Sequence, residues 1–323
     1  MKSLLSVQSH VSHGYVGGKA ATFPLQIQGW DVDVISTVNF SNHTGYGHTK
    51  GSTISVEDLS NIFDGLEDIG VKYEGIVSGY ISNKELIDSI VDRISGFKKV
   101  NLNMTYLLDP VMGDEGVLYV DNNCVEAYRK VIVGSDLHPP SELIDVITPN
   151  QYELELILEL PKSISTLYEL KDAILLLRYK NPHIKHIVVT SYRLPSDKEN
   201  IYCAFNSYSN SETVEYCCVP IIRSYFTGIG DLFLAILMDK LTTCYSLPLA
   251  VNQTLTVVTQ TLELTHKSGS EQYQREMGHP LPANTGAKIN QESIIKYFEL
   301  RIIDARHLYG YLGSGTFDIQ TIQ

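Results

Sequence analysis

Hydrophobic positions along the chain follow two different periods, which together predict short strands connected by amphipathic helices. The strand-like runs are apolar and β-branched, and each ends in polar or turn residues. Helix-like runs lie between them, and the run at 55–70 opens with Ser55 and Asp58 in the spacing of a capping box. We expect strands at 3–9, 31–38, 73–81, 105–111, 144–150 and 185–191, and helices over most of 13–29, at 55–70 and at 83–97.

Strands that alternate with helices of this length predict an α/β fold with a mainly parallel sheet covered on both faces. The tyrosine- and serine-rich segment 200–222 breaks the alternation and is typical of antiparallel strands, whereas 39–51 is a polar loop too long for a simple turn. No repeat or linker divides the 323 residues, so we expect one domain over 1–323. From about residue 244 onward C-terminal helices complete this domain. The helices expected after Gly228 are 231–242, 248–266 and 291–308.

Polar residues stand where the expected strands end. In an open parallel sheet, ligands bind outside the carboxyl ends of the strands. Hydroxyl, amide and carboxyl groups at this edge can hold a polar ligand, phosphates or a metal ion. The residues in question are Ser9, Tyr80, Asp109, Thr148, Asn150, Thr190 and Ser191.

The segment YFTGIGDLFLAIL, residues 225–237, places a carboxylate at the start of an apolar helix directly after a glycine turn. One interpretation is structural, because aspartate in the first turn of a helix meets the positive end of the helix dipole. The other is functional, because free N–H groups at a helix start bind anions, phosphate above all. The segment alone leaves both open.

Two acidic pairs allow the same two interpretations. Asp109 ends a strand and Asp114 follows five residues later, which makes either an Asp-Pro turn or a place for a divalent ion that takes few protein carboxylates. Asn150 and Glu153 have helical spacing on a first turn, which indicates either an N-cap or two groups facing the same crevice as Asp109.

Several familiar catalytic motifs are missing from the sequence. Residues 13–21 approach a Walker A loop, but Ala20 replaces the hydroxyl that would bind magnesium. Neither TGYGHTK nor TGIGDLF has the third glycine of a dinucleotide fingerprint, and the chain contains no G-x-S-x-G or H-E-x-x-H. Esterase and metalloprotease functions therefore have no support, and a phosphate site would be of another kind.

Composition and charge limit the partners. The chain is 43% hydrophobic and 19% charged, which is typical of a globular protein. Its formal net charge of −12 disfavours nucleic acids and anionic membranes, since both reward a basic surface. Five cysteines without C-x-x-C spacing and a short N-terminal apolar run predict an intracellular protein in a reducing compartment.

Seven segments occur together and in order along the chain. They are SVQSHVSHGYVGGKAATFPLQIQGWDVD, NFSNHTGYGH, SGY, DPVMGDEG, ITPNQYELE, VTS and GIGDLF. As a set they resemble the pyridoxal kinases of the ribokinase-like superfamily. The likeness runs from residue 3 to about 243 and is greatest toward fungal members, and SNHTGY, DPVMGD and ITPNQ separate this branch from sugar kinases.

This resemblance implies a three-layer α/β/α fold and ATP-dependent phosphorylation of the 5′-hydroxymethyl group of pyridoxal, pyridoxine and pyridoxamine. It implies Mg²⁺, a monovalent cation (K⁺ or Na⁺), a homodimer, and a cytoplasmic or also nuclear location. Asp231 matches the catalytic base, and Gly228, Ile229 and Gly230 match the anion hole. The pyridoxal pocket would be lined by Ser9, Val16, His43, Thr44 and Tyr80 beside Asp231; the cation sites by Asp109, Thr148 and Glu153; and the ATP side by Asp114, Tyr119, Asn150, Glu153, Thr190 and Ser191.

Two alternatives stay open at this point. Hydroxymethylpyrimidine kinases of the same superfamily often carry cysteine at the last position of the glycine turn, so Asp231 counts against that function. A catalytically weak paralogue that binds vitamin B6 is favoured only by Ile229, where many members have a threonine that reaches the phosphates; Thr227 is a candidate substitute. The segment 114–119 is also short compared with some relatives.

Overall fold

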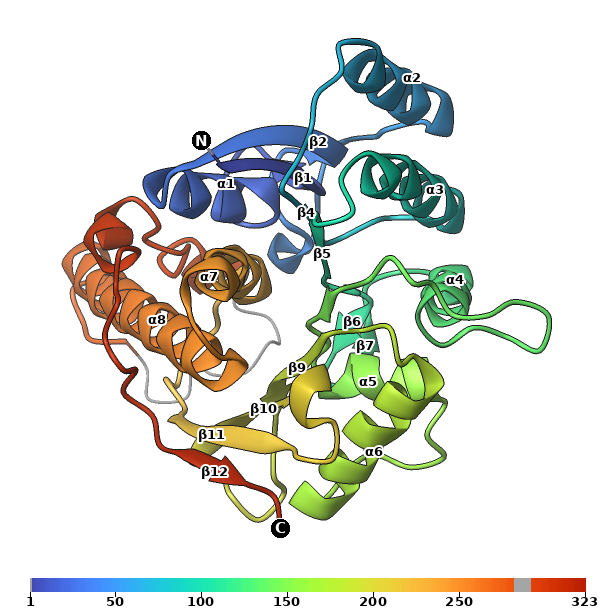
Figure 1. Cartoon of the computed structure of the whole chain (residues 1–323). Helices are drawn as coiled ribbons and strands as arrows, with labels where there is room; N and C mark the ends of the chain where they lie inside the picture. The colour runs from blue at the N-terminus through green and yellow to red at the C-terminus, as the bar shows by residue number, and fades with distance from the viewer. Residues whose placement is uncertain (1, 282–291) are drawn as a thin grey trace.

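A ten-stranded sheet forms the centre of the computed structural model, which describes residues 2–281 and 292–323 (Figure 1). Six strands run parallel, while β3 and the run from β10 to β12 pair antiparallel with their neighbours. In sheet order the strands are β12 (Ile319–Thr321), β11 (Glu215–Pro220), β10 (Asn200–Ser207), β9 (His186–Tyr192), β8 (Val146–Ile147), β5 (Thr105–Leu108), β4 (Gly75–Ser78), β1 (Lys2–Val11), β2 (Trp30–Phe40) and β3 (Gly51–Thr53).

Helices cover both faces of the sheet, and this confirms the expected α/β/α layers with a mainly parallel sheet (Figure 1). One apolar core lies beneath each helical layer. The helices of the first layer are α1 (Gly18–Ile27), α7 (Ile229–Thr243) and α8 (Leu247–Met277); those of the second are α2 (Val56–Asp68), α3 (Lys84–Val100), α4 (Asn122–Val133), α5 (Gln151–Leu158) and α6 (Leu167–Lys180).

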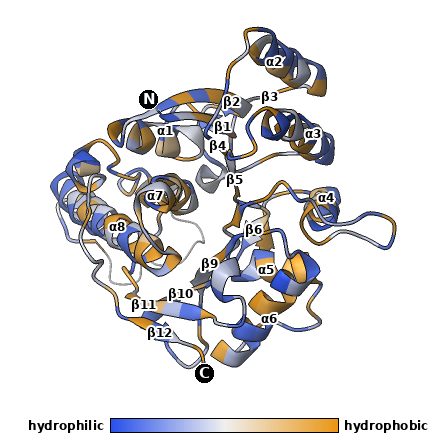
Figure 2. Ribbon diagram, in the orientation of Figure 1, coloured by the Kyte–Doolittle hydropathy of each residue, from blue (hydrophilic) through white to orange (hydrophobic). Residues whose placement is uncertain are grey.

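The second layer shows how the sequence pattern produces a two-sided helix. In α2, Leu59 and Phe63 are fully buried while most other positions are exposed, and Figure 2 shows hydrophobic and hydrophilic residues side by side on this helix. Ser55 caps it by accepting a hydrogen bond from the Asp58 N–H at 3.0 Å.

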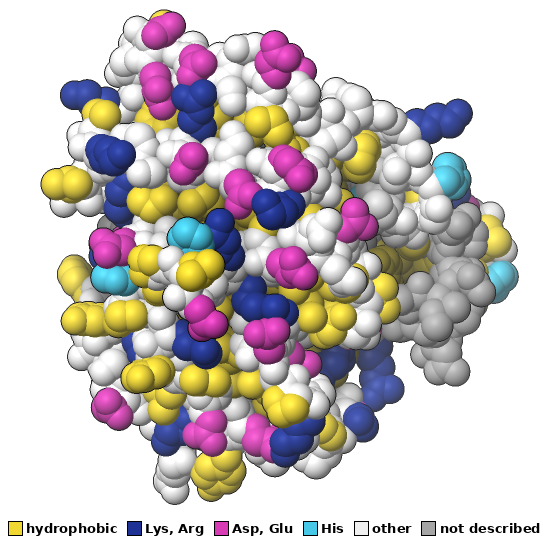
Figure 3. Space-filling model, turned by 90° about the vertical axis from the view of Figure 1, so that its right-hand side faces the viewer, with side chains coloured by type: hydrophobic (Ala, Val, Ile, Leu, Met, Phe, Trp, Pro, Cys, Tyr) yellow, Lys and Arg dark blue, Asp and Glu magenta, His cyan; other side chains and the backbone are white. Residues whose placement is uncertain are grey.

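On the outside of this layer, acidic and basic side chains are interspersed, as is typical of a solvated surface (Figure 3). Within the described ranges, no helix is both long and apolar enough to cross a membrane.

All six expected strands are present, and the antiparallel hairpin expected at 200–222 is confirmed as β10 and β11. The helix expected over most of 13–29 begins only at Gly18, because Gly14 and Gly17 have positive φ. The loop expected at 39–51 is shorter, because β2 extends to Phe40 and β3 begins at Gly51. The sequence patterns missed α4, α6 and two short edge strands, β3 and β12.

The helix expected at 291–308 is wrong, and residue 291 lies outside the described residues. Only α9 (Glu292–Ile295) and a 3₁₀ turn at Asp304–Leu308 are helical. Between them Phe298, Leu300 and Ile302 are buried at every second position, which is the burial pattern of an extended segment. Helix α8 instead continues to Met277, well beyond the expected end at 266.

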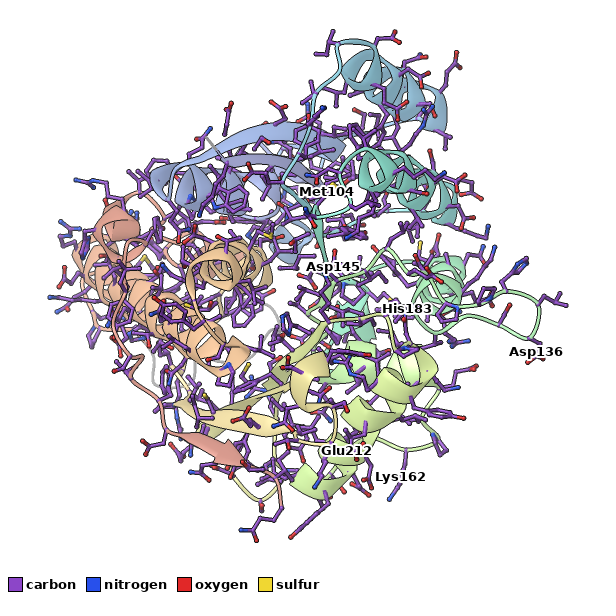
Figure 4. The ribbon with its side chains drawn as sticks, in the orientation of Figure 1. Met104, Asp136, Asp145, Lys162, His183 and Glu212 are labelled. Atoms are coloured by element: carbon purple, nitrogen blue, oxygen red, sulfur yellow. The ribbon has the colours of Figure 1, made fainter. Side chains whose placement is uncertain are left out.

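The amino edge of the sheet is held by one buried carboxylate, Asp145. Its oxygens pair with Lys98 and Lys185 and accept the Tyr106 N–H at 2.8 Å. Lys98 also donates to the Met104 carbonyl, and Figure 4 labels Met104 and Asp145 beside the starts of β5 and β8. This acidic residue is fully paired and serves the fold, in contrast to the acids at the opposite edge.

Candidate active site at the start of α7

The carboxylate of Asp231 is held in the first turn of α7 by groups from the first strand and the loop after it. Oδ2 accepts the backbone N–H of Gly17 at 2.7 Å, and Oδ1 accepts Nε2 of Gln8 at 3.2 Å. Gln8 is fully buried and its Oε1 accepts the hydroxyl of Ser6 at 2.8 Å. The carboxylate is therefore fixed in orientation by a chain of hydrogen bonds that runs into β1.

A glycine at position 228 is required for α7 to begin here. Gly228 has a φ of 86°, and a Cβ at this position would lie 2.1 Å from the carbonyl oxygen of Tyr15. No side chain of the described residues caps the helix, and its first backbone hydrogen bond runs from the Leu232 N–H to the Gly228 carbonyl. The preceding N–H groups, those of Ile229, Gly230 and Asp231, have no acceptor within the helix and form an anion-binding helix start.

The side chain at position 229 packs away from this anion-binding turn. Ile229 lies against the apolar core formed by α1, α7 and α8, so only its backbone N–H remains for an anion. The hydroxyl of Thr227 is buried and has no hydrogen-bond partner among the described residues. Nothing in the structure shows this hydroxyl taking the place of the threonine that the resemblance led us to expect at 229.

Burial raises the pKa of Asp231 to about 6, and the hydrogen bond from Gly17 only partly offsets it. The dipole of α7 favours the anionic form, but desolvation outweighs the dipole. The carboxylate is still mostly ionised at neutral pH, but its proton affinity is closer to that of a working base.

Asp109 and Glu153 add two buried acids, of which Asp109 lies near Asp231 and Glu153 lies near Asp109. A Cβ on Gly230 would lie 3.3 Å from Oδ2 of Asp109, which places that carboxylate beside the glycine turn. Burial, followed by the charges of Glu153 and Asp231, raises the pKa of Asp109 well above its usual value. Burial also raises the pKa of Glu153 to about 8. Three backbone N–H groups that bind its carboxylate oppose this rise, and the charge of Asp114 adds to it.

The hydroxyl of Thr148 is a further unsatisfied group at this edge. Thr148 is 3% exposed, and its Oγ1 has no hydrogen-bond partner among the described residues. A buried unpaired hydroxyl on the same edge as buried acids that lack a basic partner within the described ranges fits a bound cation, which would favour the ionised form of those acids. No three His, Cys, Asp or Glu side chains of the described part are placed to hold a metal by themselves, which suits an ion that completes its shell with phosphates and water.

The predicted nucleotide residues gather around the start of α5. Asn150 and Glu153 form a complete capping box, which confirms the structural interpretation of their spacing. The Asn150 amide also donates to the Gly113 carbonyl at 2.7 Å, and so ties α5 to the hairpin of β6 (Gly113–Asp114) and β7 (Val117–Leu118). Asp114 and Tyr119 lie on this hairpin, and Thr190 and Ser191 lie near the end of β9, where the Thr190 N–H donates to the Pro149 carbonyl.

The predicted pyridoxal residues lie on the other side of Asp231. Ser9 sits at an irregularity in the pairing of β1 with β2, and its Oγ occupies the space that a Cβ on Gly17 would fill. Val16, the residue before Gly17, is buried, and Tyr80 follows Gly79, whose added Cβ would be 3.6 Å from Oδ1 of Asp231. In the loop after β2, His43 is buried whereas Thr44 is exposed at the start of a 3₁₀ turn (Thr44–Tyr46), so the structure does not bring the Thr44 side chain into the same buried set.

Three residues of the site were missed by sequence reasoning. Gln8 was visible as a polar residue within a buried strand, and Gly17 as one of several glycines before the first helix. Glu299, which binds the loop after β2, gave no signal because its segment was expected to be helical.

Comparison with known proteins shows to which class of proteins this chain belongs. A family model described as phosphomethylpyrimidine kinase matches residues 27–276, more than half of the chain, and the chain therefore belongs to this class of small-molecule kinases. The Saccharomyces cerevisiae protein named "Putative pyridoxal kinase BUD16" is 40% identical over 96% of this chain and 95% of its own. Bovine pyridoxal kinase is 35% identical over 73% of this chain and 76% of its own.

Within that class the chain belongs to the pyridoxal kinase family. The pyridoxal kinase of Leishmania donovani, solved with ADP and pyridoxine, has a TM-score of 0.83 at 27% identity and covers 99% of each chain. The resemblance drawn from the seven segments, its likeness to fungal members and the ribokinase-like fold are thereby confirmed.

The substitution Gly228→Ala should destabilise the protein more than Gly29→Ala. Both glycines have positive φ, which costs alanine about 1–2 kcal/mol. Only at 228 does the new Cβ meet a backbone atom, the Tyr15 carbonyl, whereas nothing lies within 4 Å at 29. Urea unfolding of both variants measures the loss in the free energy of unfolding. Equal losses would show that the Tyr15 carbonyl can move away from the new Cβ without destabilising the protein.

Proposed function

We propose that this chain transfers the γ-phosphoryl group of ATP to the 5′-hydroxymethyl group of pyridoxal, pyridoxine and pyridoxamine. The observation that carries the proposal is the Asp231 carboxylate, oriented by Gly17 and Gln8 beside the open helix start of α7. A base and a set of anion donors thus stand next to each other, as transfer to an alcohol requires.

Asp231 would accept the proton of the vitamer hydroxyl as the oxygen attacks the γ-phosphorus. Its two hydrogen bonds aim the carboxylate, and its raised pKa brings it nearer to the pH at which proton transfer is efficient. The N–H groups of Ile229 and Gly230 would stabilise charge on the phosphoryl oxygens without rearranging, because the helix already fixes them. The Ile229 side chain is not needed for this donor role.

The nucleotide would bind on the side of α5, the β6–β7 hairpin and the end of β9. Asp114, Tyr119, Asn150, Thr190 and Ser191 are its proposed contacts. Mg²⁺ and K⁺ or Na⁺ would be held by Asp109, Thr148 and Glu153, where they would neutralise charge on the phosphates. The buried acids and the unpaired Thr148 hydroxyl support these sites.

The vitamer would bind between β1, Tyr80 and the loop that carries His43 and Thr44. A homodimer and a cytoplasmic or also nuclear location remain part of the proposal through family likeness. The competing acceptor is a pyrimidine, hydroxymethylpyrimidine, because the matching family model is described as phosphomethylpyrimidine kinase.

Asp231→Ala should lower the turnover of pyridoxal at least about a hundredfold, because the reaction loses its base. The assay measures pyridoxal 5′-phosphate formed from ATP with Mg²⁺ and K⁺, and Asp88→Ala, which removes an exposed i,i+4 ion pair, serves as control. If the wild type phosphorylates hydroxymethylpyrimidine in preference to pyridoxal, the acceptor is the pyrimidine and the proposed substrate is wrong. Tight pyridoxal binding without any turnover would instead favour a catalytically weak B6-binding protein.

The kcat/KM for pyridoxal should decline as the pH falls through about 6. Asp231 must be unprotonated to act as base, and its raised pKa means that it gains a proton in this range. Measuring the pH profile with both pyridoxal and pyridoxine distinguishes titration of the enzyme from titration of the substrate. A decline at the same pH with both substrates reports a group of the enzyme. A constant kcat/KM down to pH 5 would contradict the assigned pKa.

Thr148→Val keeps the shape of the side chain and removes the unpaired hydroxyl. Without cations the variant should be no less stable than the wild type, because a buried unsatisfied hydroxyl costs about 1–3 kcal/mol. With K⁺ and Mg²⁺ added, the wild type should gain more thermal stability than the variant, since it alone keeps this ligand. Equal gains in melting temperature would place the cations elsewhere.

A further inference from the structure

The carboxylate of Glu299 joins the C-terminal segment to two loops near Asp231. Oε1 accepts hydrogen bonds from Nε2 of His43 at 2.9 Å and from the Tyr46 hydroxyl at 2.8 Å. Oε2 accepts the backbone N–H of Tyr15 at 3.0 Å. The side chain is 11% exposed, so all three bonds lie in a largely desolvated place.

All three partners of this carboxylate are donors. His43 Nδ1 accepts the Gly45 N–H at 3.2 Å, which leaves the proton on Nε2, the atom that faces Glu299. The Tyr46 hydroxyl and the Tyr15 N–H can both donate. Burial raises the pKa of Glu299, but the hydrogen bonds from His43, Tyr46 and Tyr15, and the positive charge of His43 when it is protonated, outweigh burial and lower the pKa overall. Only a carboxylate offers acceptors in all the directions required.

The space around Glu299 is shaped to receive it. Gly14 has a φ of 90°, and a Cβ on this residue would lie 2.6 Å from Oε2 of Glu299. Neither alanine nor a larger residue fits at position 14 without displacing the carboxylate. Glycine at position 14 is therefore required by the Glu299 carboxylate, independently of where helix α1 begins.

The segment that Glu299 holds at Tyr15 continues directly to the base. The Tyr15 carbonyl packs against Gly228, and two residues later the Gly17 N–H binds Asp231. On its other side, Glu299 fixes the turn that contains His43 and Tyr46. One side chain therefore sets two of the walls that enclose the proposed vitamer pocket.

We propose that Glu299 is a positioning residue for the vitamer: it holds the loop 41–50 and the segment 15–17 in the arrangement that binds the pyridine ring against Asp231. The inference rests on the proposed acceptor site. It assigns no contact between Glu299 and the nucleotide, so the binding of the two substrates should respond differently to its loss.

Glu299→Gln tests this with almost no change of shape. Its amide nitrogen must face at least one of the three donors, so one side of the anchor is lost while the volume is kept. We expect the dissociation constant for pyridoxal, titrated without ATP, and the KM for pyridoxal to rise about tenfold to a hundredfold. The KM for ATP should stay within about twofold.

The matched control is Glu276→Gln. Glu276 accepts the Tyr297 hydroxyl at 2.7 Å and so anchors the same C-terminal segment, and its other partners among the described residues, Gln272 and Lys296, lie outside both loops. Both KM values should remain those of the wild type. Tyr46→Phe removes one donor and keeps the carboxylate, and it should give a smaller rise in the pyridoxal constants, which provides a second test if the glutamine variant folds poorly.

The outcomes separate the inference from the proposed function. Unchanged pyridoxal binding in both Glu299→Gln and Tyr46→Phe would overturn the positioning role. Equal rises in the KM for pyridoxal and for ATP, with a lower melting temperature, would also overturn it in favour of a purely structural contact. A wild type that binds pyridoxal without phosphorylating it would overturn the kinase proposal, while the titrations would still decide the role of Glu299.

Discussion

The close approach of the Tyr15 carbonyl to Gly228 is the constraint on which the site depends. It brings the loop after β1 against the start of α7, although more than two hundred residues separate them in sequence. Because the two backbones touch, the Gly17 N–H reaches Asp231 and the first N–H groups of α7 stay open. A side chain at 228 would separate the base from the group that orients it.

Electrostatics distinguish the two edges of the sheet. At the amino edge, Asp145 is neutralised by two lysines and stabilises the fold. At the carboxyl edge, Asp109, Glu153 and Asp231 form no ion pair with a lysine or arginine of the described residues. Burying charges without partners is costly, and such arrangements mark functional sites more often than structural ones. The raised pKa values of Asp109 and Glu153 reflect this cost, and ligands that bring their own cations would favour the ionised forms of these acids.

Local patterns in the sequence predicted those parts of the fold that local forces decide. Apolar runs identified the strands, and the spacing of Asn150 and Glu153 predicted a helix start that is a complete capping box. The motifs also placed Asp231 correctly at the start of a helix. The error at 291–308 arose because alternate residues there pack against α8 and its neighbours, a tertiary contact that a helical pattern in the sequence cannot reveal.

Other features of the site depend on competition between distant groups, which no single segment records. The dipole of α7 favours an ionised Asp231, but the burial created by surrounding elements prevails. Glu299 reaches His43 only because the C-terminal segment passes beside the loop after β2. In the sequence, Glu299 cannot be distinguished from an exposed glutamate of a surface helix.

The bond between His43 and Glu299 spans 256 positions along the chain, and this separation has a consequence for how the protein is made. The first strands and helices leave the ribosome long before Glu299 is synthesised, on the order of tens of seconds at usual elongation rates. During that interval the nascent chain can form much of its parallel sheet while the loop after β2 lacks its anchor. The acceptor side of the site is therefore completed only after Glu299 has been synthesised and its segment has packed beside the loop after β2.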